Sequence, residues 1–264
     1  MSLWKFLPQH NPWYKMTGLQ DVIDRFSEDI DISFSDKLTQ GMRKKLKNET
    51  IAGISEELSL PIIDWENARS RRDYNTYTFS YDPIEDYVSE GRLIHGVKME
   101  VSLASLSFPT VELPVESYVY QYLMKENEDI VDEYDLHPFT MKVQNIDRTL
   151  ADKVFAICDY YLQGKTKRYS RHIYDIHKLL PKVPLEEEFK VLVKQVGEAR
   201  AEMDICPSAV SGVNVPELLM EIIDKEIYKE DYASITTYFQ REPISYDDAI
   251  KSLEIIVKSG IFEE

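Results

Sequence analysis

The sequence predicts an α+β fold, with a mixed β-sheet and helices in residues 1–146 and helices alone in residues 147–264. Two observations support this division. Before residue 146, apolar residues alternate with polar ones in several short segments, which is the period of strands. From Thr149 onward, apolar residues recur every three or four positions, which is the period of helices. Mixed elements followed by helices are typical of an α+β domain with a second, helical domain.

Length and composition bound the kind of protein. The 264 residues are enough for a full core, and 43% hydrophobic with 30% charged residues is typical of a globular chain. The 31 basic and 47 acidic residues give a net charge of −16, which argues against non-specific nucleic-acid binding. No apolar run is long enough to span a membrane, and no signal peptide is apparent, so we expect a cytoplasmic protein. The two cysteines, Cys158 and Cys206, lack metal-ligand spacing and are expected to be small buried apolar residues or part of a Pro-flanked turn.

The segment Asp29-Ile30-Asp31-Ile32-Ser33-Phe34 is the first strand with a chemical signal. Side chains alternate along a strand, so Asp29 and Asp31 share one face while Ile30 and Ile32 share the other. Two carboxylates on one face repel each other, and a divalent cation with oxygen ligands, first of all Mg²⁺, would compensate them. An exposed edge strand whose acids lie in water is the alternative. Asp-x-Asp alone is too short to decide between the two.

The elements that follow alternate between helix and strand. We expect a helix capped by Ser35 or Asp36 and ending near Leu58. Glu100 projects from the polar side of a later strand, and if that strand lies beside Asp29, three carboxylates converge on one cation. We expect the strands at residues 73–81, 97–103 and 141–146, and a short helix at 115–124.

The second part reads as a series of helices. Thr149 is expected to cap the first of these, in which Lys153 lies just off the apolar stripe. Ser170 is expected to cap the next, where Arg171 and Asp175 have the spacing of a surface ion pair, although either Arg171 or Lys178 could instead bind phosphate. The same two alternatives, a solvated helix face or a phosphate site, stay open for the basic residues between Lys165 and Lys182. Further helices are expected at residues 185–200, 216–229, 232–239 and 246–258.

Three ordered motifs give the sequence a family resemblance. They are Arg25-Phe26-Ser27-Glu28-Asp29-Ile30-Asp31, then Thr149-Leu150-Ala151-Asp152-Lys153-Val154-Phe155-Ala156, then Ser170-Arg171-His172-Ile173-Tyr174-Asp175-Ile176. In order and separation they resemble the AbiEii-type nucleotidyltransferase toxins of the polymerase-β-like superfamily, which occur in bacterial abortive-infection and toxin–antitoxin systems. The resemblance covers most of the chain from about residue 20 onward and implies a nucleotidyltransferase-like sheet domain.

The resemblance also implies a chemistry. Asp29 and Asp31, with Glu100 as third carboxylate, would bind catalytic Mg²⁺, and Lys153, Arg171 and Asp175 would handle a nucleoside triphosphate. The nucleotide would pass to an RNA acceptor, tRNA included, or to a protein, and a cognate antitoxin would be the partner.

One feature of the family pattern is missing before residue 29. Family members carry a Gly-Gly-(Ser/Thr) turn that binds phosphate, and here Thr17-Gly18-Leu19 is the only candidate, with Gly18 as its nucleotide-binding residue. We expect the chain either to begin after the family's first strand and turn or to have lost them. Three functions therefore stay open: an active nucleotidyltransferase, a catalytically inactive member acting as a binding or interaction protein, and a metal-dependent nuclease or hydrolase.

Overall fold

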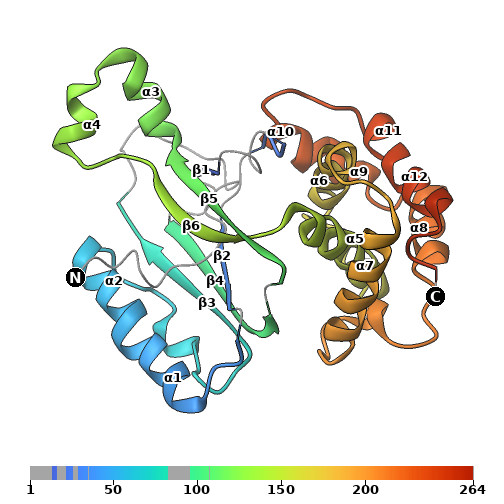
Figure 1. Cartoon of the computed structure of the whole chain (residues 1–264), viewed down its shortest axis with the longest axis horizontal. Coiled ribbons are helices and arrows are strands. Elements are labelled where there is room, and N and C mark those ends of the chain that lie inside the picture. Colours follow the sequence, from blue (N-terminus) through green and yellow to red (C-terminus); the bar gives the residue numbers. More distant parts are fainter. Residues whose placement is uncertain are drawn as a thin grey trace. The chain divides into compact units, whose positions relative to one another are not determined.

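The computed structural model describes residues 14–16, 22–25, 29–34, 36–82, 96–106 and 108–263. Its described residues form two compact units. The first unit contains residues 14–16 and those between 29 and 143, and the second contains residues 22–25 and 144–263. Strands and helices mix in the first unit and helices fill the second, which confirms the predicted α+β class (Figure 1). The division into domains near residue 146 stays a prediction.

The predicted Asp29 strand lies in a three-stranded sheet with the order β2–β4–β3. Strand β2 (Asp29–Phe34) runs parallel to β4 (Gly96–Leu106), and β3 (Tyr74–Ser80) pairs with β4 antiparallel. All three strands were expected from their alternation. The apolar side of each strand is buried, so the opposite, polar side of the sheet is left free of the core.

Helices cover the apolar side of this sheet. They form one continuous helical segment, made of α1 (Gln40–Lys45), a π-helical part (Leu46–Ile51) and α2 (Ala52–Leu58). The core that they share with the strands contains Ile32, Ile51, Ile54, Tyr77, Phe79, Met99, Val101 and Leu103.

The predicted start of this helix is wrong. Thr39 is the cap, because its extended backbone lets the side-chain oxygen accept from the Met42 N–H at 3.3 Å. Asp36 lies before the first helical turn, and Ser35 lies outside the described residues. The predicted end at Leu58 is confirmed, with Ser59 in the left-handed region at φ 54°.

A second sheet in the first unit has the order β1–β5–β6. It consists of β1 (Tyr14–Met16), β5 (Thr110–Ser117) and β6 (Phe139–Gln144), and α3 (Tyr118–Glu126) and α4 (Asp129–Glu133) connect the last two. The helix predicted from Val115 starts three residues late in the structure. Residues up to Ser117 continue β5, and the Ser117 hydroxyl caps α3 by accepting from the Tyr120 N–H at 2.9 Å.

The second unit is helical throughout its described residues. Its longest elements are α5 (Ile146–Leu162), α6 (Arg171–Leu179), α7 (Glu187–Ala201), α8 (Val215–Asp224) and α12 (Lys251–Ser259). Shorter ones are α9 (Lys229–Asp231), a π-helical turn (Tyr232–Thr236), α10 (Thr237–Phe239) and α11 (Tyr246–Ala249). The core includes Leu150, Ile157, Cys158, Ile173, Ile176, Leu179 and Leu219, all of them fully buried. Cys206 is buried too, so burial, one of the two alternatives predicted for the cysteines, holds for both.

Both predicted caps in this unit need correction. Asn145 rather than Thr149 caps α5, because its side-chain oxygen accepts from the Asp147 N–H at 2.8 Å. Ser170 does precede α6, but its hydroxyl bonds to Thr236 at 2.7 Å instead of capping the helix. The Ser170 N–H donates instead to the Asp231 carboxylate at 3.0 Å. In the part of the chain that the structure describes, no helix has the length and apolarity needed to cross a membrane.

Candidate functional site

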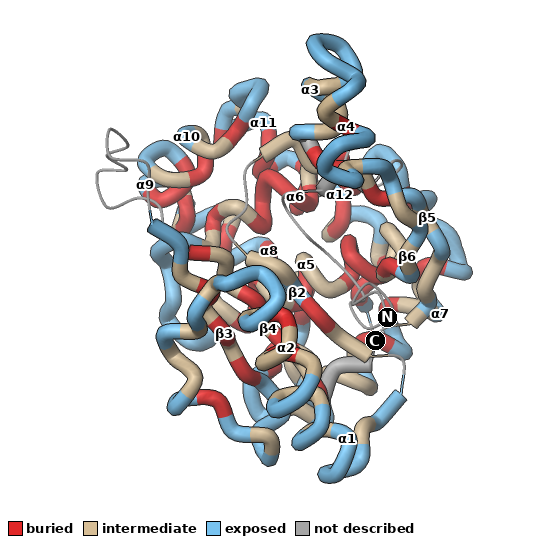
Figure 2. Tube along the Cα trace, turned by 90° about the vertical axis from the view of Figure 1, so that its left-hand side faces the viewer, coloured by how far each residue is buried: buried red, intermediate tan, exposed pale blue. Residues whose placement is uncertain are grey.

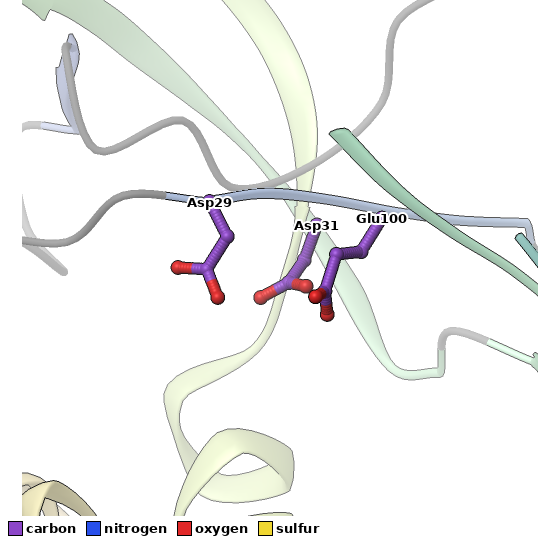
Figure 3. Close-up of side chains that lie close together, drawn as sticks. All are labelled: Asp29, Asp31 and Glu100. Carbon is purple, nitrogen blue, oxygen red and sulfur yellow. The ribbon is translucent and has the colours of Figure 1, made fainter. Parts of the chain in front are cut away.

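Three carboxylates converge on the polar side of the first sheet. The parallel register places Asp31 beside Glu100 and Asp29 beside Lys98. One oxygen from each of Asp29, Asp31 and Glu100 lies within 4.8 Å of the other two. Figure 3 shows the three side chains projecting from β2 and β4 toward the same side. The condition stated for Glu100, that its strand lies beside Asp29, is met.

The carboxylate cluster has the donor set of a hard-cation site. Ligand oxygens at 2.0–2.6 Å from one ion lie at most about 5 Å apart, so the observed spacing needs little adjustment. Asp31 is exposed, and Asp29 and Glu100 are half-buried, which leaves access for an incoming ion. All three donors are carboxylate oxygens, which suits Mg²⁺ or Ca²⁺ better than a softer metal.

Two neighbours on the same face contact Glu100. The Lys98 ammonium forms an ion pair with the Glu100 carboxylate. The Tyr74 hydroxyl, on β3, also hydrogen-bonds to Glu100, and burial together with this bond raises the pKa of Tyr74 well above its usual value. Tyr74 therefore stays a neutral phenol that donates to the carboxylate. Lys98 and Tyr74 thus both contribute to holding Glu100 in place.

A second cluster of charges lies within the second unit. The Asp175 carboxylate is completely buried and accepts from Arg25 Nε at 2.6 Å and Arg25 Nη2 at 2.7 Å. The Lys153 ammonium lies 3.1 Å from the second Asp175 oxygen, Oδ2. Burial by itself would raise the pKa of Asp175, but the charges of Arg25 and Lys153 outweigh it and hold the pKa well below its usual range. Asp175 is therefore ionised and paired inside the protein. The prediction that it takes part in an ion pair on the surface is wrong.

His172 packs beside this cluster. Its ring stacks on Tyr160 with 5.4 Å between centroids, and it is buried. Burial, and then the positive charges of Lys153 and Arg171, hold the pKa of His172 well below its usual value, so the imidazole is neutral. The cationic groups near it are thus Lys153, Arg171 and Arg25.

The predicted site residues fall into two groups. The structure brings Asp29, Asp31 and Glu100 together in the first unit, and it brings Lys153 and Asp175 together in the second. Arg171 is the first residue of α6, one helical turn before Asp175. Gly18 lies outside the described residues.

Sequence reasoning assigned no role to Arg25, Lys98 or Tyr74. Arg25 could have been noticed, because it opens the same motif that contains Asp29 and Asp31. Lys98 lies two residues before Glu100 and therefore on the same face of the strand, which was a weaker signal. Nothing local pointed to Tyr74, whose contact with Glu100 depends on how β3 pairs with β4.

The mixed sheet with three converging carboxylates is consistent with the class of nucleotidyltransferase-like proteins, which generally work with a divalent metal. The family model described as nucleotidyl transferase AbiEii toxin, type IV toxin–antitoxin system, matches residues 15–252. The chain belongs to this family of toxins. Neither the curated proteins nor the solved structures contain a match to the chain.

Proposed function

We propose that the chain is a Mg²⁺-dependent nucleotidyltransferase of the AbiEii toxin type. It transfers a nucleotide from a nucleoside triphosphate to a hydroxyl group of an RNA, tRNA included, or of a protein in the cytoplasm. A cognate antitoxin counteracts it in a bacterial toxin–antitoxin or phage-defence system. The observation that carries the proposal is the convergence of Asp29, Asp31 and Glu100 in a chain that matches this family over residues 15–252.

The carboxylates of Asp29, Asp31 and Glu100 are the groups that would hold the metal. Mg²⁺ bound there supplies charge neutralisation for the phosphates and a lower pKa for the attacking hydroxyl. Lys98 compensates one of the three negative charges through its ion pair with Glu100. Asp29 and Asp31 lie on one strand and offer the carboxylate oxygens that a divalent ion prefers.

We assign the nucleotide phosphates to Lys153 and Arg171. Both are cationic and neither is fully buried, and the Lys153 side chain is 25% exposed. Asp175 has no exposed surface with which to contact a nucleotide, so its part in nucleotide handling is to position Lys153. Charge-assisted bonds from such groups orient a triphosphate for in-line transfer.

The direct test is transfer of label. The chain is incubated with each labelled nucleoside triphosphate, Mg²⁺, and either total RNA or a protein lysate. We expect label in one acceptor class, and a loss of about 100-fold or more in Asp31→Asn, since one metal ligand carries several kcal/mol of transition-state stabilisation. The matched control is Asp36→Asn, an exposed acid just beyond β2, which should keep full transfer. No transfer with any triphosphate, or equal transfer by Asp31→Asn, contradicts the proposal.

A second candidate function follows from the sequence before Asp29. No Gly-Gly pair occurs there, and such a turn is the family's backbone site for phosphate. A member without it could keep the fold as a catalytically inactive binding protein. Calorimetric titration with Mg²⁺–GTP and Mg²⁺–CTP separates the two functions. Saturable binding that Lys153→Ala abolishes supports the enzyme, whereas absence of binding supports the inactive member.

A further inference from the structure

Basic residues gather on one surface of the first unit although the whole chain carries a net charge of −16. Residues 37–48 contain five basic residues and no acid, and residues 67–72 contain three arginines and no acid. We call the cations of these two segments the basic surface; six of them are exposed, and Arg43 and Lys47 are half-buried. Its members are Lys37, Arg43, Lys44, Lys45, Lys47, Arg69, Arg71 and Arg72. Figure 2 shows that most of α1, which carries several of them, is exposed.

Three contacts fix the two segments side by side. Gln40 Nε2 donates to the Ser70 hydroxyl at 3.2 Å, at the beginning of α1. Arg43 forms an ion pair with Asp73 at 2.8 Å, and Lys47 donates to the backbone oxygen of Ala68 at 2.8 Å. The basic surface is therefore a single continuous feature of the fold and does not depend on how the two units are arranged.

Two members of the basic surface pair with acids, Arg43 with Asp73 and Lys45 with Glu49, and five of the others form no ion pair with a described residue. Lys47, Arg69 and Arg72 donate to backbone carbonyl oxygens of the segment 65–68, which carry no net charge. Among the described residues, no ion pair involves Lys44 or Arg71. Burial, followed by repulsion from Arg69, lowers the pKa of Lys47 below its usual value. An anion on this surface would relieve that repulsion.

The start of β3 connects the basic surface to the carboxylate cluster along the chain. Arg72 lies two residues before Tyr74, the first residue of β3, and the Tyr74 hydroxyl hydrogen-bonds to Glu100. Thr76 is the strand partner of Glu100, so residue 72 lies four residues back, at most roughly 13 Å along the chain. Since β3 is an edge strand of its sheet, a polynucleotide on the basic surface can pass around this edge to the polar side, where the three carboxylates lie.

We propose that the basic surface binds the phosphodiester backbone of a polynucleotide acceptor and leads its end toward Asp29, Asp31 and Glu100. This inference rests on the proposed function and specifies the acceptor class and where it binds. The cations attract successive phosphates without reading sequence. Tyr74, a residue that is 44% exposed, offers an aromatic ring on which a base can stack next to the site. That aromatic face favours a polynucleotide over an acidic protein segment.

Binding is tested apart from transfer, on the full chain in EDTA and without nucleotide. Fluorescence anisotropy measures the affinity for a short single-stranded RNA, for the DNA of the same sequence and for polyglutamate, over a series of salt concentrations. The double variant K44E/R71E should bind about tenfold or more weakly than the unaltered chain. Its salt slope should fall by about 1.4, because two phosphate contacts are lost. The tighter of RNA and DNA identifies which sugar the acceptor has.

The matched control is K125E/K142E, which makes the same change of charge at exposed lysines of the first unit outside the basic surface. It should bind RNA within about twofold of the unaltered chain, and circular dichroism checks that both variants are folded. Equal weakening by both pairs, no RNA or DNA binding at low salt, or equally tight binding of polyglutamate overturns the inference. If K44E/R71E binds RNA more weakly but the unaltered chain transfers no label to any acceptor, the proposed function alone is contradicted. If the unaltered chain transfers label to RNA but K44E/R71E binds RNA as tightly as the unaltered chain does, this inference alone is contradicted.

Discussion

Asp175 and Asp31 are the same residue type in opposite surroundings. Around Asp175, two cations, Arg25 and Lys153, face one buried carboxylate, so the formal charges sum to +1. Around Asp31, three carboxylates share one face, and Lys98 pairs with one of them, Glu100. The first carboxylate is compensated by buried cations and has a structural task. The second group offers a set of carboxylate oxygens of the kind that a divalent cation prefers.

The first prediction concerns Asp175→Asn. The change leaves the Arg25 side chain, only 8% exposed, and Lys153 without their counter-charge. Breaking a buried pair from one side costs about 3–5 kcal/mol, so we expect the free energy of unfolding of the second unit to fall by that amount. Urea unfolding followed by circular dichroism measures it.

Asp248→Asn is the control for this prediction. Asp248 pairs with Lys251 at 2.7 Å in the same unit, but both side chains are more than half exposed, at 59% and 63%. Exposed ion pairs contribute little, so the midpoint of unfolding should hardly move. If Asp175→Asn were as mild as Asp248→Asn, the buried cluster would not anchor the unit.

At the scale of elements, local pattern predicted what is decided locally. Alternation identified β2, β3 and β4, and the apolar stripes identified α5 to α8 closely. The ends were less certain, because capping depends on which polar residue has an extended backbone, as the choice of Asn145 over Thr149 illustrates. β1 and α4, with three and five residues, are too short for a periodic signal.

The sequence likewise predicted only those parts of the candidate site that depend on local geometry. The shared face of Asp29 and Asp31 follows from strand geometry, so it could be predicted, and Glu100 could be added only on the condition that β4 pairs with β2. Arg25 could not be assigned, because its partner Asp175 lies 150 residues away along the chain. Contacts of that separation depend on tertiary packing and leave no trace in local periodicity.

The second prediction tests the cap of α5. Asn145→Ala removes the oxygen that accepts from the Asp147 N–H, and the loss of such a cap costs about 1 kcal/mol of stability. Asn145→Asp keeps an acceptor in place and should retain most of the stability. Thermal unfolding of the two variants provides the comparison. Equal melting temperatures for Asn145→Ala and Asn145→Asp would mean that the helix start is fixed by other contacts.

The third prediction concerns the pairing of β2 with β4. Mg²⁺ bound by residues of both strands stabilises the folded first unit by about 2.7 kcal/mol when its concentration is 100 times the Kd. We expect Mg²⁺ to raise the melting temperature of the unaltered chain and of Asp36→Asn. The shift should disappear in Asp31→Asn and in Glu100→Gln. Scanning calorimetry with and without Mg²⁺ measures this, and an undiminished shift in either site variant would place the ion elsewhere.

At the scale of the whole molecule, each unit has a hydrophobic core of its own, and the chain does not divide at a single point. Residues 22–25 belong to the second unit although β2 begins only four residues later. The contacts that hold them there include the ion pair of Arg25 with Asp175 and an isolated antiparallel β-bridge between Arg25 and Gln240. The Tyr174 hydroxyl also donates a hydrogen bond of 3.0 Å to the backbone oxygen of Asp24. The motif that contains Arg25 and Asp29 thus contributes to both units.

The last prediction follows from this division. Leu150→Ala makes a cavity in the second core and costs about 2–5 kcal/mol, and Met99→Ala does the same in the first. Hydrogen exchange should then lose protection in residues 144–263 and in residues 22–25 for Leu150→Ala, and in β2, β3 and β4 for Met99→Ala. The informative segment is 22–25, since its sequence neighbours are in the first unit while its contacts are in the second. Protection at Asp24 and Arg25 that followed Met99→Ala instead would show that Asp175 does not hold this segment.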